Sequence, residues 1–293
     1  MRILINIFVL ITAFVSVTSA SDVKSPELYT LPFTKADGLL LVEAQMDDQV
    51  GVFIFDTGAD GILINSSESA DGQDVSFETL TGVVTASEVT VPEITFGDYV
   101  FNKVAAFTSD LSALESYLDI QLLGILGVDI FENNVLYIDN KNGLIRVFDS
   151  ASELADYNFP ASMLKVKVEV VNNKFILPLE VGEATYRFLL DSGSSVSMVD
   201  LDIIDEESLT RQARSMELYT AGPNSETTSI YQAQEVKLSN LKVKNMQFGV
   251  TDFSNLNASL DEPIAGILSI EQLAISAMIL DKKNEILYLQ FPK

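Results

Sequence analysis

Short apolar runs rich in β-branched and aromatic residues, several of them alternating with polar positions, recur along the chain and predict an all-β protein. Clear examples lie at 161–171, 188–190 and 287–291. A period of two indicates a strand with one buried face. Helices are expected to be few and short, and the best candidates lie at 110–118 and 271–277.

One β-hairpin is predicted directly from its turn. The polar segment Asp139-Asn140-Lys141-Asn142-Gly143 separates the apolar runs 135–138 and 144–148, and a Gly that ends a short polar segment between two such runs is typical of a hairpin. The segment lacks the acidic spacing of a calcium-binding loop. No metal site is therefore expected here.

The pattern is written twice along the chain. Residues 52–59 (Val-Phe-Ile-Phe-Asp-Thr-Gly-Ala) return at 187–194 (Arg-Phe-Leu-Leu-Asp-Ser-Gly-Ser), 135 positions later. Residues 124–129 (Gly-Ile-Leu-Gly-Val-Asp) return at 266–271 (Gly-Ile-Leu-Ser-Ile-Glu), 142 positions later. Two constant offsets indicate two copies of one unit, with a longer connection in the second copy.

The expected architecture is therefore two similar β-barrel-like lobes related by pseudo-twofold symmetry, with few short helices. Residues 21–150 would form the N-terminal lobe and residues 151–293 the C-terminal lobe, and the change from one to the other falls within 149–162. Equivalent residues of two such copies can meet at the symmetry axis. The extra residues of the second copy are expected within 218–231.

Residues 1–20 have the pattern of a cleaved secretory signal peptide. A basic Arg2 precedes an apolar run at 3–17, and small residues at 18–20 precede a polar start. The mature chain is then expected to be secreted or periplasmic, without stable membrane insertion. An uncleaved membrane anchor is the alternative, although the apolar run is short for a full span.

The amino-acid composition limits the kinds of active site that the protein can build. The chain contains no His and no Cys, which excludes Ser-His-Asp triads, Cys-His nucleophiles and sites where His or thiolate binds a metal. A net charge of −24 opposes binding to nucleic acid and to anionic membranes. Hydrolytic chemistry would therefore depend on carboxylates, and no cofactor is expected.

Two turns of the chain carry carboxylates that could support hydrolysis. Asp56-Thr57-Gly58 and Asp191-Ser192-Gly193 each follow an apolar strand, and they occupy equivalent places in the two copies. A Gly lets the chain bend sharply after a buried strand, and the turn exposes backbone amides that can hold the carboxylate. Two such turns in a duplicated chain point to one shared pair of carboxyl groups. One proton shared between two close carboxyls is the state in which such a pair activates water.

These residues resemble the retropepsin-like aspartic peptidases, the group that includes the retroviral proteases. The likeness rests on Phe55-Asp56-Thr57-Gly58-Ala59-Asp60 and on Gly124-Ile125-Leu126-Gly127, and in pattern it covers 38–291 in two copies. It implies the acid protease fold and an aspartic endopeptidase that acts on peptide or protein substrates, needs no cofactor and works as a monomer.

The resemblance also implies roles for the residues of both turns. Asp56 and Asp191 would activate a water molecule, Thr57 and Ser192 would lock the two turns together, and Gly58 and Gly193 would allow their close approach. Because Ser194 can donate a hydroxyl near Asp191 and Ala59 cannot do so near Asp56, we expect Asp191 to be the ionised partner.

The expected substrate contacts are asymmetric. Asp60 matches a residue that contacts the substrate backbone in the family, its counterpart is Ser195, and Ala59 lies beside it. Two flaps are expected over the cleft, at 78–88 with Gly82 near its tip, and at 218–232 with Tyr219 facing the substrate.

The chain departs from the family pattern at two points. Ser269 stands where the first copy has Gly127, which puts the second apolar-apolar-Gly element in doubt. No Tyr lies between Asn65 and Pro92, where pepsins carry one in the flap. This absence favours the retropepsin-like branch.

Two other functions fit the composition. A secreted binding protein that keeps the fold without catalysis is the main alternative. A glycosidase with paired carboxylates also fits the absence of His and Cys, but the chain has no Trp to line a sugar-binding cleft.

Overall fold

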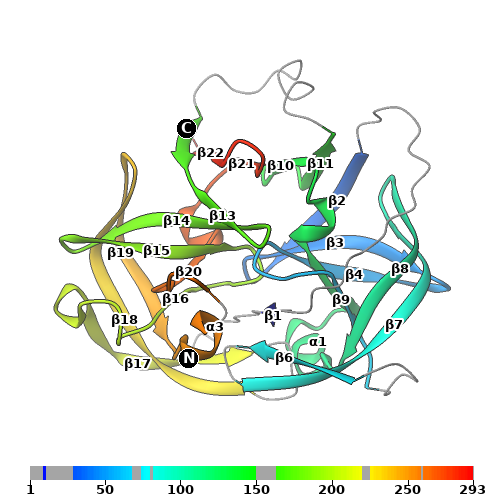
Figure 1. Cartoon of the computed structure of the whole chain (residues 1–293), viewed down its shortest axis with the longest axis horizontal. Coiled ribbons are helices and arrows are strands. Elements are labelled where there is room, and N and C mark those ends of the chain that lie inside the picture. The colour runs from blue at the N-terminus through cyan, green and yellow to red at the C-terminus, as the bar shows by residue number, and fades with distance from the viewer. Residues whose placement is uncertain are drawn as a thin grey trace.

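The computed structural model describes residues 9–10, 29–67, 74–79, 82–149, 163–219, 225–258 and 260–292. Within them the chain forms two β-barrels joined by a sheet to which both halves contribute (Figure 1). The predicted all-β architecture with duplicated lobes is confirmed.

The first half supplies eight neighbouring strands. In sheet order they are β2 (Tyr29–Ala36), β3 (Leu39–Met46), β4 (Gln49–Asp56), β9 (Leu122–Gly127), β5 (Ile62–Asn65), β8 (Tyr99–Ser109), β7 (Gly82–Phe96) and β6 (Asp74–Thr79). A second pairing, of β7 with β3, closes the barrel. The pairs β4–β9 and β5–β8 are parallel.

The second half repeats this order strand by strand. Its strands are β13 (Glu169–Val171), β14 (Lys174–Val181), β15 (Ala184–Asp191), β20 (Gly266–Ser269), β16 (Ser197–Val199), β19 (Leu241–Val250), β18 (Ser225–Leu238) and β17 (Thr210–Tyr219). Pairing of β14 with β18 closes this barrel. Its parallel pairs, β15–β20 and β16–β19, match those of the first half.

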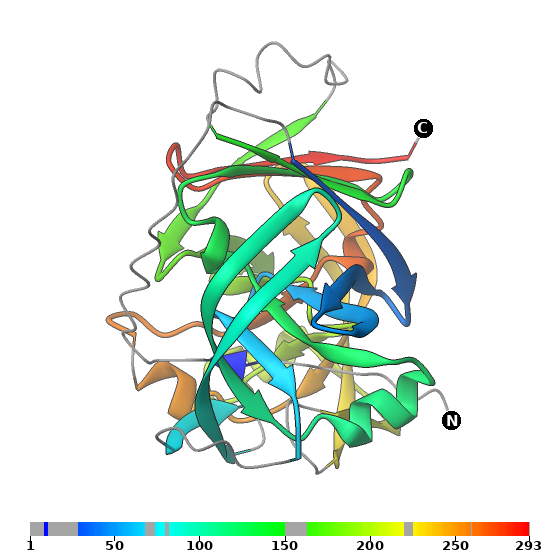
Figure 2. The same cartoon turned by 90° about the vertical axis from the view of Figure 1, so that its right-hand side faces the viewer.

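A sheet shared by both halves joins the barrels at one end of the molecule (Figures 1 and 2). Its order is β2, β11 (Leu144–Phe148), β10 (Val135–Asp139), β21 (Ala277–Asp281), β22 (Ile286–Gln290) and β12 (Leu164–Lys167). Strands β10 and β11 confirm the predicted hairpin. Strands β21 and β22 repeat them at the offset of 142 residues, so each half contributes three strands.

The described helices are short. The helix expected at 110–118 is present as α1 (Ser112–Leu118), whereas α3 (Ser254–Asn257) was not predicted. The helix expected at 271–277 is wrong: a 3-10 turn covers Glu271–Leu273, and β21 begins at Ala277. Ala274 ends that turn with a φ of 49°, and pairing with β10 and β22 then holds the chain extended.

The strands that lead to the two Asp residues are buried over their last four positions. Phe53 and Phe55 in β4, and Phe188 and Leu190 in β15, are 0% exposed. Burial of such side chains contributes about 1.5–3 kcal/mol each. Packing on both faces therefore fixes the ends of β4 and β15 inside the molecule.

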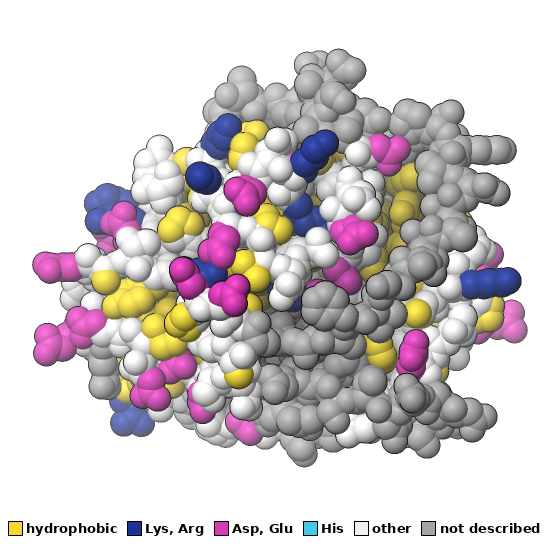
Figure 3. Space-filling view, viewed as in Figure 1, with side chains coloured by type: hydrophobic (Ala, Val, Ile, Leu, Met, Phe, Trp, Pro, Cys, Tyr) yellow, Lys and Arg dark blue, Asp and Glu magenta, His cyan; other side chains and the backbone are white. Residues whose placement is uncertain are grey.

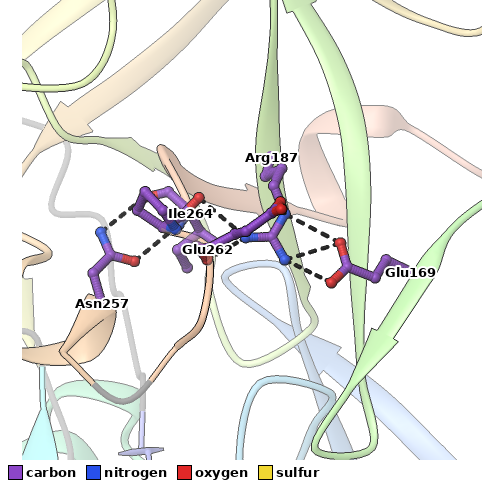
Figure 4. Close-up of polar contacts among 6 residues, drawn as sticks. Glu169, Arg187, Asn257, Glu262 and Ile264 are labelled. Atoms are coloured by element: carbon purple, nitrogen blue, oxygen red, sulfur yellow. Dashed lines mark hydrogen bonds and ion pairs between the residues drawn. The ribbon is translucent and has the colours of Figure 1, made fainter.

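Polar contacts hold the segment that leads into β20 (Figure 4). Arg187 of β15 forms a bidentate ion pair with Glu169 and donates to the carbonyl oxygens of Glu262 and Pro263. Asn257 of α3 accepts from Ile264 N (2.8 Å) and donates to Ile264 O (3.0 Å). The start of β20 is thereby tied to β15 and to α3.

Two long hairpins extend along the side opposite the shared sheet (Figure 1). They are β6–β7 and β17–β18, and they correspond to the flaps predicted at 78–88 and 218–232. Their connecting residues, 80–81 and 220–224, lie outside the described residues. Strand β6 lies against α3 of the second half, so the first hairpin crosses between the halves.

The N-terminal segment is described only at β1 (Val9–Leu10), which pairs with β6. The rest of the predicted signal peptide and most of the predicted boundary at 149–162 lie outside the described residues. Within the described part of the chain, none of the helices is long and apolar enough to cross a membrane. On the face drawn in Figure 3, acidic side chains are spread among fewer basic ones, in keeping with the net charge of −24.

Candidate active site

The two predicted turns meet at the centre of the molecule. Asp56 is the last residue of β4 and Asp191 the last residue of β15, and both are fully buried. Parallel pairing places Gly127 of β9 beside Asp56 and Ser269 of β20 beside Asp191. Residues 135 positions apart in the sequence thus form one site.

Four hydrogen bonds join the two turns across the symmetry axis. The Thr57 hydroxyl donates to Leu190 O (2.8 Å) and accepts from Ser192 N (3.0 Å). The Ser192 hydroxyl donates to Phe55 O (2.7 Å) and accepts from Thr57 N (3.0 Å). All the groups involved are buried, where an unpaired polar group costs about 1–3 kcal/mol. This reciprocal set of bonds fixes the spacing of the two Asp residues.

Glycines allow the close approach. Gly58 N donates to Asp56 Oδ1 and Gly193 N donates to Asp191 Oδ1, both at 2.7 Å. A Cβ atom at Gly193 would overlap Asp56 Oδ2, and one at Gly58 would lie 3.1 Å from Asp191 Cγ. Each glycine therefore leaves the space that the opposite carboxyl group fills.

The second oxygens of the two carboxyl groups face a protein interior without donors. Asp56 Oδ2 and Asp191 Oδ2 are buried and receive no hydrogen bond from an N–H or hydroxyl group of the described residues. The carboxyl groups instead interact with each other. A proton on one of them supplies the missing donor, so the pair is arranged to hold one proton.

Electrostatics supports the shared proton. Burial raises the pKa of Asp56 to about 6, against the lowering effects of its hydrogen bonds and of the Lys174 charge. Burial also raises the pKa of Asp191 well above its usual value, and the nearby charge of Asp56 raises it further. Two like charges this close are costly in a dry site.

The prediction that Asp191 is the ionised partner stays a prediction. It relied on the Ser194 hydroxyl, which in the structure donates to Val196 O (2.5 Å). The backbone of Ser194 hydrogen-bonds Asp191, and the backbone of Ala59 does the same for Asp56. The two turns therefore offer matching backbone support to their carboxyls.

The predicted substrate contacts occupy different surroundings. Asp60 is largely buried and pairs with Lys174 (Nζ to Oδ2, 2.5 Å). Ala59 and its counterpart Ser194 are buried, as is Ser195; Ala59 packs in the hydrophobic cluster of the first barrel. Only the first turn has a carboxylate at the Asp60 position, and the asymmetry of the substrate contacts stays a prediction.

Gly82 and Tyr219 lie at the ends of the two hairpins. Gly82 begins β7 and pairs with Thr79 beside the turn. Tyr219 ends β17, and its ring stacks on Tyr117 of α1 with 4.9 Å between ring centroids. In this structure Tyr219 therefore contacts the first barrel, so the second hairpin also crosses between the halves.

Ser269 is accommodated where the first half has Gly127. Its hydroxyl donates to Ser194 O (2.6 Å) and its N–H donates to Ser197 Oγ (3.0 Å). At Gly127 a Cβ would lie 2.7 Å from Ala59 O. The second apolar-apolar-Gly element thus keeps its place in the sheet despite the substitution.

Sequence reasoning missed the basic residue of the site, Lys174. The offset of 135 aligns Lys174 with Leu39, and a cation aligned with a buried leucine was a signal that could have found it. No group of three or more acidic residues suited to a metal ion occurs in the described ranges.

Comparison with known families agrees with this geometry. The family model described as aspartyl protease matches residues 42–130 and 177–271. The two matches contain one Asp turn each and together cover more than half of the chain. A search of curated protein sequences gives no match. The chain belongs to the aspartyl protease family, with both of its Asp-Thr/Ser-Gly turns carried on one polypeptide.

Proposed function

We propose that this protein is an aspartic endopeptidase that hydrolyses peptide bonds with water activated by Asp56 and Asp191. The observation that carries the proposal is the buried carboxyl pair, whose facing oxygens receive no N–H or hydroxyl donor from the described residues. A pair held in this way by four reciprocal hydrogen bonds has no evident structural use. A catalytic use accounts for its burial and for its raised pKa values.

The chemistry follows from one shared proton. The ionised carboxyl takes a proton from water as the water attacks the scissile carbonyl carbon, and the protonated carboxyl donates to the carbonyl oxygen. The resulting tetrahedral species breaks down when the amine leaves with a proton, and no covalent intermediate with the protein is formed. Family membership supports a peptidase in general; the role of each Asp is the proposal.

The test is cleavage of a diverse peptide mixture from about pH 3 to about pH 8, a range that includes the raised pKa of Asp56. The mature chain is compared with Asp56→Asn and Asp191→Asn. Either substitution removes the ionised or the protonated member, so cleavage is expected to fall by at least about 100-fold. Asp110→Asn is a suitable control, because Asp110 is an exposed residue beside α1.

The outcome also separates the alternatives. A folded parent protein that cleaves no peptide at any pH would favour a binding protein that keeps the fold without catalysis. Loss of activity in only one of the two Asp variants would contradict a shared pair. We further propose that the substrate is an extended peptide or protein segment bound between the hairpins, and that the enzyme acts as a monomer outside the cytoplasm after signal cleavage.

A further inference from the structure

A second buried contact joins the halves close to the carboxyl pair. Lys174, the first residue of β14, belongs to the second half, and Asp60 lies four residues after Asp56 in the first half. Their 2.5 Å ion pair is well shielded, with the Lys174 side chain 5% exposed and that of Asp60 18% exposed. The ammonium group also donates to Asn172 O (3.4 Å). A cation from one half is thus inserted beside the catalytic turn of the other.

Further charged groups surround this ion pair. Asp129 accepts from Gly61 N (2.6 Å), and Lys282 donates to Val128 O (3.2 Å). Burial raises the pKa of Asp60 to about 6 despite the Lys174 charge, and burial also raises the pKa of Asp129. Burial lowers the pKa of Lys282 to about 8. Asp60, Asp129, Lys174 and Lys282, with Glu132 facing Lys282, form a compact ionic cluster.

The second turn has no equivalent cluster. Ser195 takes the place of Asp60, and Leu39 takes the place of Lys174. The ion pair nearest in kind is Lys35–Glu271, which joins the halves at 3.1 Å. Its side chains are 33% and 47% exposed, so water screens them. In the described part of the chain, the position equivalent to the buried Lys174 is therefore apolar.

Burying an ion pair is costly, and replacing one by apolar residues of similar volume is often neutral or even stabilising. Stability alone thus gives little reason for a lysine at position 174. A buried cation does, however, favour the charged form of any carboxyl near it. The Lys174 ammonium group is held by Asp60, four residues after Asp56, so its charge lies on the side of the first turn, where it lowers the pKa of Asp56.

We propose that Lys174 is a positioning residue of the carboxyl pair: its ammonium group, held by Asp60, keeps the negative charge on Asp56 and leaves the shared proton on Asp191. Asp56 is then the group that accepts a proton from water, and Asp191 is the group that donates to the carbonyl oxygen. These chemical roles rest on the proposed function, whereas the charge distribution does not.

The direct test is titration of the Asp side-chain carboxyls by ¹³C NMR in the full mature chain and in Lys174→Met. Loss of the cation is expected to raise the lower apparent pKa of the pair by about one unit. Lys174→Arg keeps the charge and should restore the parent value. Lys35→Met removes the exposed lysine between the halves and should leave the titration unchanged.

A double variant guards against misfolding. In Lys174→Met the carboxyl of Asp60 loses its partner, so Lys174→Met/Asp60→Asn removes both charges together. The upward shift is expected when the double variant is compared with Asp60→Asn, because the Asp60 charge itself raises the pKa of Asp56. A lower apparent pKa that does not rise on loss of Lys174 in either folded background would overturn the proposal.

Kinetics provides an independent measurement. The acid limb of kcat/KM should move to higher pH by the same amount in Lys174→Met, and not in Lys35→Met. If the parent cleaves no peptide, the proposed function fails while the NMR titration still decides the role of Lys174. If the parent cleaves peptides and neither the titration nor the acid limb moves, the role of Lys174 is refuted and the peptidase stands.

Discussion

The two halves of the molecule are closely alike at the axis and differ three residues further along each turn. Thr57 and Ser192 make the same pair of hydrogen bonds in opposite directions. Beyond them, a buried ion pair at Asp60 corresponds to Ser195, and Gly127 corresponds to Ser269. The residues whose hydrogen bonds cross the axis are chemically alike in the two halves. The residues that make no such reciprocal bond differ.

The two short helices also carry hydrogen-bond acceptors at equivalent positions but of different residue types. Glu115 of α1 accepts from Leu122 N (3.1 Å) ahead of β9, and Asn257 of α3 accepts from Ile264 N (2.8 Å) ahead of β20. Both pairs are separated by the offset of 142 residues. A carboxylate and an amide thus accept from equivalent N–H groups, while the equivalent carbonyl oxygens receive their bonds from Asn65 in the first half and from Asn257 in the second. The duplication preserves positions of acceptors rather than residue types.

The largest expected effect tests the glycines of the two turns. Gly193→Ala would drive a Cβ into Asp56 Oδ2, whereas at Gly58 the nearest atom, Asp191 Cγ, is 3.1 Å away. Displacement of a reacting group by about 1 Å can cost about 100-fold in rate. Gly193→Ala should therefore lower kcat/KM about 100-fold and Gly58→Ala by less. Equal losses in the two variants would contradict the structural difference between the turns.

The next effect tests the symmetry of the axis. Thr57→Val and Ser192→Ala each remove one donated and one accepted hydrogen bond. Each should lower the free energy of unfolding by about 2–3 kcal/mol, since buried polar groups are left unpaired. Denaturant unfolding of both variants measures the two values. A difference of more than about 1 kcal/mol between the two losses would show that the two hydroxyl groups do not contribute equally to stability.

The smallest effect concerns the hairpins. Tyr219 of the second hairpin stacks on Tyr117, while the position that matches Tyr117 in the second half is Ser259. Tyr219→Ala should cost about 1 kcal/mol of aromatic packing, and hydrogen exchange in β17 should become faster. Tyr219→Phe keeps the ring and serves as the control. Unchanged exchange in Tyr219→Ala would show that this contact does not hold the hairpin.

Much of this arrangement could be predicted from the sequence, because duplication repeats its motifs at fixed offsets. The turns at Asp56 and Asp191, the hairpin at 135–148 and the flap positions all lie in segments with strong local patterns. The role of Lys174 could not be read in this way. A lysine that begins a strand looks solvent-exposed, and its partner Asp60 is 114 positions away.

Short elements also could not be predicted from the sequence pattern. α3 has four residues, too few to show a helical period. The segment 271–277 has apolar positions that fit a helix or a strand, and pairing of β21 with β10 decided the outcome. The Ser194 hydroxyl donates to Val196 O, two residues further along, a local contact that the sequence pattern does not reveal.

The shared sheet has a consequence for the time at which activity can arise during synthesis. Strand β10 is made early, yet its neighbour β21 lies 142 positions further along, and the next strand β22 follows β21. A nascent chain that ends before residue 290 thus lacks part of the sheet that clamps the barrels together. Because domains fold as they emerge from the ribosome, the first barrel can form alone while Asp56 still waits for its partner. The carboxyl pair is therefore complete only after the second half of the chain has been made.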